Sequence, residues 1–158
     1  MLSEKLIDVI NSGESVAIAG SGISIEAGLP SWPQLLSKLA DYFDSRGLDT
    51  SRARSLAAKT KFPEAFDSLS EVSSIEEVHS QVKQLVSQVT TPGQYHKRLA
   101  DWPFKFYITT NYDCLIEKSS GGRLVAVRNT GRELHKLSAG VHDVVWHGMV
   151  LPTRIVSS

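Results

Sequence analysis

The sequence predicts an α/β fold, in which a parallel sheet has helices on both faces and a small helical lobe is inserted between strands. Three observations support this prediction. Short apolar runs rich in β-branched residues alternate with amphipathic helical stretches, as in parallel sheets linked by helical crossovers. A glycine-rich turn, Gly20-Ser21-Gly22, directly follows the first apolar run. A long helical block, at about residues 33–100, separates the first run from the second.

Length and composition restrict the class of protein. The 158 residues are enough for one domain with a real core, and the 17 basic and 17 acidic residues give a net charge of zero, so nucleic-acid binding is not expected. No apolar run is long enough to span a membrane, and the first ten residues do not resemble a signal peptide. Cys114 is the single cysteine, which excludes an internal disulfide and a cysteine-cluster zinc site. We therefore expect a cytoplasmic protein without a metal.

The N-terminal elements follow from apolar periodicity. Residues 4–12 predict a short helix that stops at Gly13, and residues 15–19 predict a buried strand. The glycine turn then leads into a helical turn at 23–27. Ser31, Pro33 and Gln34 form a capping-box pattern at the start of a helix that continues to about residue 46.

The rest of the chain alternates in the same way. Further helices are predicted at 50–59, 63–69, 75–89 and 95–102, the third behind a second capping box. Strands are predicted at 104–109, 124–127 and 143–147, and a helix opens near Asp113. In parallel sheets ligands bind beyond the carboxyl ends of the strands. The glycine turn, residues 110–113 and His147 all fall at such ends.

The glycine turn is suited to a phosphate or pyrophosphate group. Closely spaced glycines let the backbone approach a ligand, and a helix start offers free N–H donors. The usual dinucleotide fingerprint is only half present, because Ile25 stands where a third glycine is expected. Asp41, the acidic residue at the expected distance, lies inside a predicted helix, which argues against an ordinary dehydrogenase. A strand-to-helix turn without a ligand remains the alternative.

Each candidate polar residue also has a structural explanation. Asn111 could orient a ribose or a water, or it could bond its own turn. Asp113 could bind a ligand amide, or it could cap the following helix. His147 could act as a general base near neutral pH, or it could be a satisfied structural group. Cys114 is expected to be a buried, inert thiol. The remaining histidines are expected at the surface: His79, His96, His135 and His142.

Three ordered motifs resemble those of the sirtuin-like family of NAD-consuming domains. The first, G-A-G-x-S…G-[IL]-P in the family, is matched by Gly20, Gly22, Ser24, Gly28 and Pro30. The second, T-[QT]-N-x-D, is matched by Thr110, Asn111 and Asp113. The third, a catalytic histidine followed by glycine, is matched by His147 and Gly148.

The resemblance implies a Rossmann-like sheet that binds NAD as a substrate and cleaves its nicotinamide–ribose bond. It implies that Asn111 positions the ribose and the attacking water, that His147 acts as the base, and that Asp113 holds the nicotinamide amide. The pyrophosphate would lie on residues 20–24. The full set of implied NAD-binding residues is Gly20, Ser21, Gly22, Ile23, Ser24, Pro30, Thr110 and Asp113.

Two departures from the family pattern refine these expectations. The four-cysteine zinc module of the family's deacylases is missing, so the chain more closely resembles the bacterial zinc-less NAD hydrolases, which commonly act as effectors of antiviral defence. These are usually held inactive by assembly with a sensor domain or a partner protein, and we expect a homo-oligomer. The chain ends ten residues after Gly148. The adenosine-binding strands normally follow that segment, so residues 1–158 are expected to be the N-terminal portion of the domain.

Two other functions stay open at this stage. One is NAD-dependent transfer, as in a protein deacylase or an ADP-ribosyltransferase. The other is a non-catalytic module that binds a nucleotide or only a partner protein.

Overall fold

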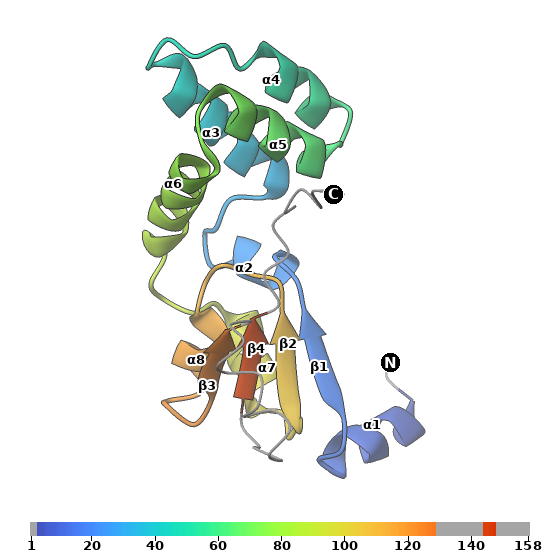
Figure 1. Cartoon of the computed structure of the whole chain (residues 1–158). Helices are drawn as coiled ribbons and strands as arrows, with labels where there is room; N and C mark the ends of the chain where they lie inside the picture. Colours follow the sequence, from blue (N-terminus) through green and yellow to red (C-terminus); the bar gives the residue numbers. More distant parts are fainter. Residues whose placement is uncertain (1–2, 129–143, 148–158) are drawn as a thin grey trace, which may run out of the picture. The chain divides into compact units, whose positions relative to one another are not determined.

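The structure is a computed structural model of the 158-residue chain, and it describes residues 3–128 and 144–147 (Figure 1). The chain divides into two compact units. The sheet unit comprises Met1–Gly28 and Thr90–Met149, and the helical unit is built from Leu29–Val89.

The sheet unit contains the predicted parallel sheet. Its strands are β1 (Val16–Ala19), β2 (Phe106–Thr109), β3 (Val125–Arg128) and β4 (Val144–His147). They lie in the order β1-β2-β4-β3, and every neighbouring pair is parallel. The alternation of apolar strands and helices therefore predicted correctly that the chain is α/β with parallel strands. It did not predict that β4 would lie between β2 and β3.

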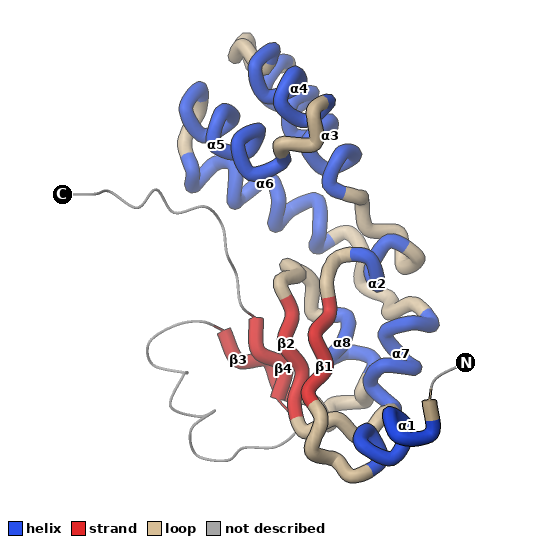
Figure 2. The backbone as a smooth tube through the Cα atoms, turned by 90° about the vertical axis from the view of Figure 1, so that its right-hand side faces the viewer, coloured by secondary structure: helices blue, strands red, loops and turns tan. Residues whose placement is uncertain are grey.

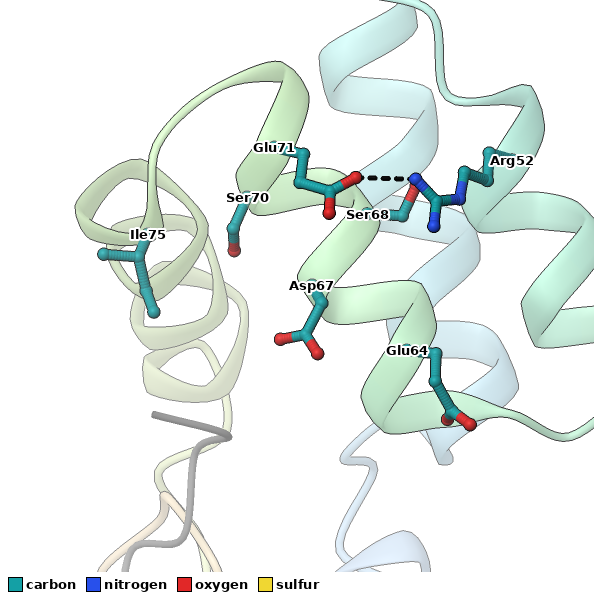
Figure 3. Close-up of a pocket in the computed structure, with 7 residues that line it drawn as sticks. All are labelled: Arg52, Glu64, Asp67, Ser68, Ser70, Glu71 and Ile75. Carbon is teal, nitrogen blue, oxygen red and sulfur yellow. Dashed lines mark hydrogen bonds and ion pairs between the residues drawn. The ribbon is translucent and has the colours of Figure 1, made fainter. Parts of the chain in front are cut away.

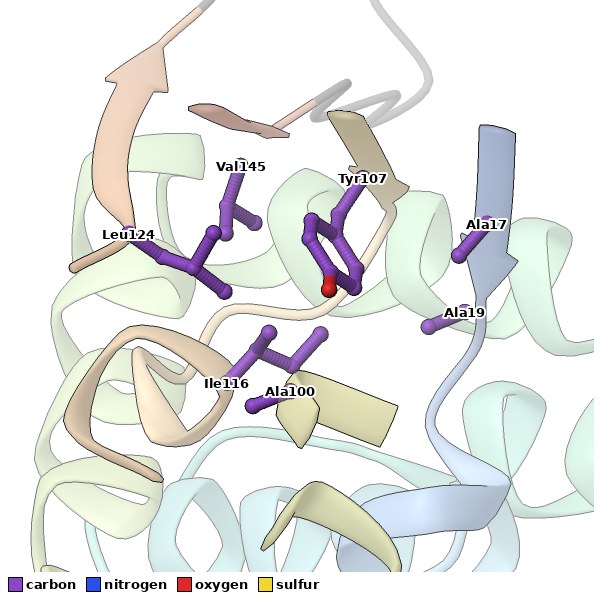
Figure 4. Close-up of a cluster of buried hydrophobic side chains, with 7 residues drawn as sticks. All are labelled: Ala17, Ala19, Ala100, Tyr107, Ile116, Leu124 and Val145. Carbon is purple, nitrogen blue, oxygen red and sulfur yellow. The ribbon is translucent and has the colours of Figure 1, made fainter. Parts of the chain in front are cut away.

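Two helices cover one face of this sheet. Helix α7 (Gln94–Asp101) and helix α8 (Leu115–Ser119) lie side by side on that face, as both views show (Figures 1 and 2). The core between sheet and helices is a single cluster of buried apolar side chains (Figure 4), which are Ala17, Ala19, Ala100, Tyr107, Ile116, Leu124 and Val145. The small side chains of β1 leave room for the Tyr107 ring, whose hydroxyl donates to the carbonyl of Trp102 at 2.9 Å.

The opposite face of the sheet carries exposed apolar side chains. Ile18 and Val125 point to this side and keep 80% and 59% of their surface exposed. Because successive strand residues alternate between faces, these side chains lie opposite the buried cluster. The predicted helices on both faces are thus confirmed for one face. Residues 129–143 and 148–158 lie outside the described part of the chain.

The remaining helices of the sheet unit are short. Helix α1 (Glu4–Asn11) begins at Ser3, whose hydroxyl accepts from the Leu6 N–H at 3.3 Å. Helix α2 (Gly22–Ile25) is a single turn directly after the glycine loop. Both correspond to predicted elements, and α2 carries Ser24 into the buried interior.

The helical unit consists of four helices whose apolar faces meet. They are α3 (Trp32–Asp44), α4 (Ser51–Ala58), α5 (Phe62–Val72) and α6 (Ile75–Ser87). Leu39, Phe43 and Leu69 are fully buried in it. Both predicted caps are present, since the Ser31 N–H donates to the Gln34 side chain at 2.9 Å and the Glu77 N–H donates to the Ser74 hydroxyl at 3.1 Å.

Helix α7 does not belong to the helical unit, although the sequence placed it in the helical block at 33–100. The helical unit ends at Val89, and α7 packs with the sheet. The reason is the apolar pair Leu99 and Ala100, which joins the core cluster beneath β1 and β2. None of the helices in the described residues is long and apolar enough to cross a lipid bilayer.

Candidate functional site

The carboxyl ends of the strands align the predicted site residues. Ala19 is in register with Thr109, and Thr109 is in register with His147 on the neighbouring strand. The loops that follow β1 and β2 therefore leave the sheet at the same edge, and His147 is the last residue of β4 at that edge. This is where ligands bind in parallel α/β sheets.

Asn111 joins the two loops. Its amide nitrogen donates to the carbonyl oxygen of Gly20 at 3.2 Å and to the hydroxyl of Ser24 at 3.0 Å. Its backbone N–H donates to the Thr109 hydroxyl at 3.1 Å, which fixes the turn after β2. An amide nitrogen has two N–H groups, so both are used in holding the glycine loop. Asn111 thus connects the first and second sequence motifs physically.

Ser24 and Asp113 form the second link between the motifs. The Ser24 hydroxyl donates to Oδ2 of Asp113 at 2.9 Å, and Oδ1 of Asp113 accepts from the Leu115 N–H at 3.0 Å. The sequence offered Asp113 as the N-cap of the following helix, but Cys114 is the N-cap of α8, and Asp113 precedes it and accepts from the first helical N–H. Each carboxylate oxygen has a second lone pair, so this contact is compatible with a ligand contact as well.

His96 is a member of this network that sequence reasoning missed. We expected it at the surface, but its side chain is fully buried and its Nε2 lies 3.1 Å from the Ser24 hydroxyl. Burial lowers the pKa of His96 below its ordinary value, and the charges of Asp113 and Glu26 only partly oppose this. One signal was available in the sequence: His96 precedes Ala100 by one helical turn, which places both on the face that packs on the sheet.

The network contains serine, histidine and aspartate, but it is not a nucleophilic triad. The single hydroxyl proton of Ser24 goes to Asp113, so His96 cannot act as the base that removes it. Ser24 is also 99% buried, with a relative exposure of 1%. A covalent serine mechanism is therefore not supported by the geometry.

Tyr112 and Cys114 flank Asp113 in the same loop. Burial raises the pKa of Tyr112 to about 12, so its hydroxyl stays protonated across the physiological range. Cys114 is half-buried rather than fully buried as expected, and it occupies the N-cap position of α8. Neither residue is placed as a base or nucleophile by these observations.

The other predicted site residues lie in both units of the chain. Ser21 and Ile23 are half-buried in the glycine loop and α2, and Thr110 is exposed after β2. Pro30 falls in the helical unit. Gly148 lies outside the described residues, as do His135 and His142. The backbone of His147 forms the last position of β4.

The two glycines of the loop leave open space beside the backbone. A Cβ built on Gly20 or Gly22 meets no other atom within 4 Å, and neither residue has a left-handed backbone. Such a backbone can accept alanine without strain, so these glycines are not required by the fold itself. Space of this kind next to exposed peptide groups is what a close-approaching phosphate needs.

This gives a first testable prediction. Gly20→Ala is expected to leave the free energy of unfolding unchanged or higher by up to ~1 kcal/mol. If the space receives a pyrophosphate, the same change weakens NAD binding by about tenfold or more, or ~1.4 kcal/mol. Thermal unfolding and calorimetric titration with NAD measure the two effects separately. Unchanged affinity would show that the space beside Gly20 does not hold the ligand.

The burial of His96 predicts that the stability of the fold depends on pH. Because its pKa is lower in the folded chain than the ordinary value of 6.5, the unfolded chain binds the proton more readily. The stability that the neutral ring contributes is complete above pH 6.5 and is lost as the pH falls through the lowered, folded-state pKa. We expect Tm to fall between pH 7 and pH 5 more steeply in the wild type than in His96→Gln. Parallel Tm curves would contradict this.

The helical unit has a separate hollow of about 470 Å³ on its own surface. The residues that line it are, apart from one isoleucine, polar or charged (Figure 3): Arg52, Glu64, Asp67, Ser68, Ser70, Glu71 and Ile75. Arg52 pairs with Glu71 at 2.7 Å, and both side chains are largely exposed, so this pair contributes little stability. None of the site residues predicted from the sequence lines this hollow.

A metal site is not evident in residues 3–128 and 144–147. No group of three or more histidine, cysteine, aspartate or glutamate side chains there is arranged to hold a metal ion. The hydrogen-bonded network around Ser24 joins one histidine and one carboxylate, His96 and Asp113, through the Ser24 hydroxyl.

Comparison with known proteins finds two relatives that are NAD(+) hydrolases. The chain is similar to the NAD(+) hydrolase ThsA of Enterococcus faecium, with 29% identity over 120 residues that cover 75% of this chain and 23% of that protein. It is also similar to the NAD(+) hydrolase ThsA of Acinetobacter baumannii, with 26% identity over 94% of this chain and 30% of that protein. The chain thus spans less than a third of either relative. No protein-family model matches it.

Proposed function

We propose that the chain contributes the catalytic sheet edge of an NAD hydrolase, which cleaves the nicotinamide–ribose bond and gives nicotinamide and ADP-ribose. The observation that supports this most strongly is the bonding of the Asn111 side chain to the glycine loop, at the edge where β4 ends in His147. The glycine loop, Asn111 and the last residue of β4 therefore lie at one edge of the sheet, and this supports their assignment to one NAD site. The similarity to two NAD(+) hydrolases points to the same substrate.

The proposed reaction needs little acid catalysis. When the bond between the ribose C1′ and the nicotinamide nitrogen breaks, the electron pair goes to the positively charged ring, which leaves as neutral nicotinamide. Positive charge then develops on the ribose, as in other glycoside cleavages. Water attacks C1′ and loses a proton. The protein therefore has to orient the ribose, position the water and accept the proton.

In this proposal Asn111 orients the ribose and the attacking water, and His147 accepts the proton from that water or from a ribose hydroxyl. Asp113 binds the nicotinamide amide, and the backbone of residues 20–24 binds the pyrophosphate together with Ser21 and Ile23. Thr110 completes the contacts to NAD within the sheet unit. The Ser24 hydroxyl already has three protein partners, so we assign it to holding the loop rather than to contacting a phosphate.

The finer assignments rest on the sequence motifs. We propose a Rossmann-like sheet of the sirtuin-like family, in its zinc-less branch, and a cytoplasmic role as an effector of bacterial antiviral defence. In this proposal a sensor domain or a separate regulatory protein controls the activity, and the chain acts in a homo-oligomer. The supporting observations are the parallel sheet and the three ordered motifs at its carboxyl edge.

Products formed in ¹⁸O-labelled water test the reaction class. The protein is incubated with NAD, both as the 158-residue chain and in any longer natural form, and the products are analysed by mass spectrometry. Hydrolysis predicts nicotinamide and ADP-ribose that carries one ¹⁸O at C1′. Release of nicotinamide without labelled ADP-ribose, together with a modified acceptor, would establish transfer instead. Binding of NAD without any nicotinamide release would indicate a non-catalytic nucleotide-binding module.

A further inference from the structure

The histidine buried beneath the glycine loop has a defined tautomer. The Gly93 backbone N–H donates to Nδ1 of His96 at 3.2 Å, so Nδ1 presents its lone pair. In a neutral imidazole the proton is then on Nε2. Nε2 lies 3.1 Å from the Ser24 hydroxyl oxygen, and it therefore acts as the donor in that contact.

This donor determines how the Ser24 hydroxyl is used. A hydroxyl can donate one hydrogen bond and accept two. Ser24 accepts from His96 and from the Asn111 amide, and its own proton goes to Asp113. Every position around the oxygen is occupied, so the Ser24 hydroxyl cannot rotate without breaking a buried hydrogen bond. A buried group that loses its partner costs about 1–3 kcal/mol, which makes this arrangement strongly preferred.

The orientation of Asn111 follows from the same bonds. Its amide nitrogen is held between the Gly20 carbonyl and the Ser24 hydroxyl, both of which accept. A rotation of the amide by 180° would place its carbonyl oxygen against the Gly20 carbonyl, which offers no proton. The ordered Ser24 hydroxyl and the Gly20 carbonyl therefore fix which end of the Asn111 carboxamide faces the loop.

The backbone that carries His96 is itself anchored to the loop side of the site. Glu26, just after α2, accepts from the N–H groups of Gln94 and Tyr95 at 3.2 and 3.3 Å, at the start of α7. A Cβ at Gly93 would lie 2.8 Å from the Glu26 carboxylate, so an alanine there would make that side chain shift. Helices α2 and α7 lie against each other as a result of the Glu26 hydrogen bonds (Figure 2). The imidazole is thus held from both its backbone and its ring.

We propose that His96 is a positioning residue, which orients the Asn111 carboxamide by donating from Nε2 to the Ser24 hydroxyl. The proposal rests on the proposed function only for its effect on catalysis, since the tautomer and the hydrogen-bond directions are properties of the chain alone. In this proposal His96 orients the Ser24 hydroxyl, and the Ser24 hydroxyl in turn orients the Asn111 amide. The charged groups that face the ring are Asp113 and Glu26.

Two substitutions of His96 test the roles of its two ring nitrogens separately. His96→Gln places an amide N–H near the position of Nε2 and keeps a donor for Ser24. His96→Asn places a carbonyl oxygen near the position of Nδ1, so it keeps the acceptor for the Gly93 N–H and loses the donor. In the full protein we expect His96→Gln to keep kcat for nicotinamide release within about threefold, and His96→Asn to lower kcat by about tenfold or more with KM for NAD little changed.

A purely structural role predicts a different result. In that case kcat would follow thermal stability, or the two variants would be equally active at temperatures well below Tm. Either outcome would overturn the proposal, and so would a loss that appears only in KM.

The ring can also be examined without any activity. Two-bond ¹H–¹⁵N correlation spectra of the histidine side chains, with His96 assigned by its loss in His96→Gln, report which ring nitrogen carries the proton. We expect a neutral ring protonated at Nε2 at pH 7.5. A ring protonated at Nδ1, or at both nitrogens, refutes the proposal even if NAD is cleaved. If instead the ring is neutral and protonated at Nε2 but the wild type never releases nicotinamide, the proposed function is wrong. The hydrogen bonds from His96 through Ser24 to Asn111 are then a structural feature of the chain.

Discussion

Asn111→Ala is expected to lower kcat for nicotinamide release by about 100-fold or more, because the ribose and the attacking water lose the group that positions them. The substitution also removes the donors to Gly20 and Ser24, at 3.2 and 3.0 Å. Each lost hydrogen bond of this kind costs about 1 kcal/mol of stability, so the chain should remain folded at 25 °C with a lower Tm. Steady-state kinetics well below that Tm measure the catalytic effect.

The matched control for this prediction is Asn11→Ala. Asn11 is the exposed last residue of α1, so the same side chain is truncated without any change at the sheet edge. We expect its kcat to equal that of the wild type. If Asn111→Ala and Asn11→Ala behave alike, the assignment of Asn111 to the reaction is wrong.

His147→Ala is expected to lower kcat by about 100- to 10,000-fold, which is the usual contribution of a general base. The backbone of His147 is the final position of β4, in register with Thr109. Because the substitution leaves the backbone pairing of β4 unchanged, the sheet should form normally. Circular dichroism and NAD titration separate the loss of the base from a loss of folding or binding.

The control here is another histidine, His79, which lies on α6 in the helical unit. His79→Ala is expected to leave kcat unchanged. Restoration of part of the His147→Ala activity by added imidazole would identify the missing group as a base. Full activity in His147→Ala would exclude that role and would leave Asn111 and water as the catalytic components.

The local features of the fold were predictable because they are encoded by neighbouring residues. The alternation in β1, with Ala17 and Ala19 buried and Ile18 exposed, and the cap at Ser74 depend on short-range sequence patterns. The strand order was not predictable in this way. Whether β4 pairs with β2 or lies beyond β3 depends on contacts between residues far apart in the chain, such as Tyr107 with Val145.

In the candidate site, too, some features could be predicted from the sequence and others depend on contacts between distant residues. The motifs predicted that Asn111, Asp113 and the glycine loop would meet, because parallel strands bring their carboxyl ends together. The contact of Ser24 with His96 joins residues 72 positions apart, and no local pattern indicates it. Helix α7 was assigned to the helical block for a similar reason, since its periodicity predicts a helix but does not say which core it packs against.

The release of nicotinamide from NAD measures directly whether this sheet edge takes part in NAD cleavage, as we propose. The assay compares the wild type with Asn111→Ala, His147→Ala and Asn11→Ala, on the 158-residue chain and on any longer natural form of the protein. We expect nicotinamide release by the wild type and by Asn11→Ala, and loss of release in the other two variants while circular dichroism shows them folded. Intact NAD with every form of the wild-type protein, in each assembly state that can be prepared, would contradict the proposal.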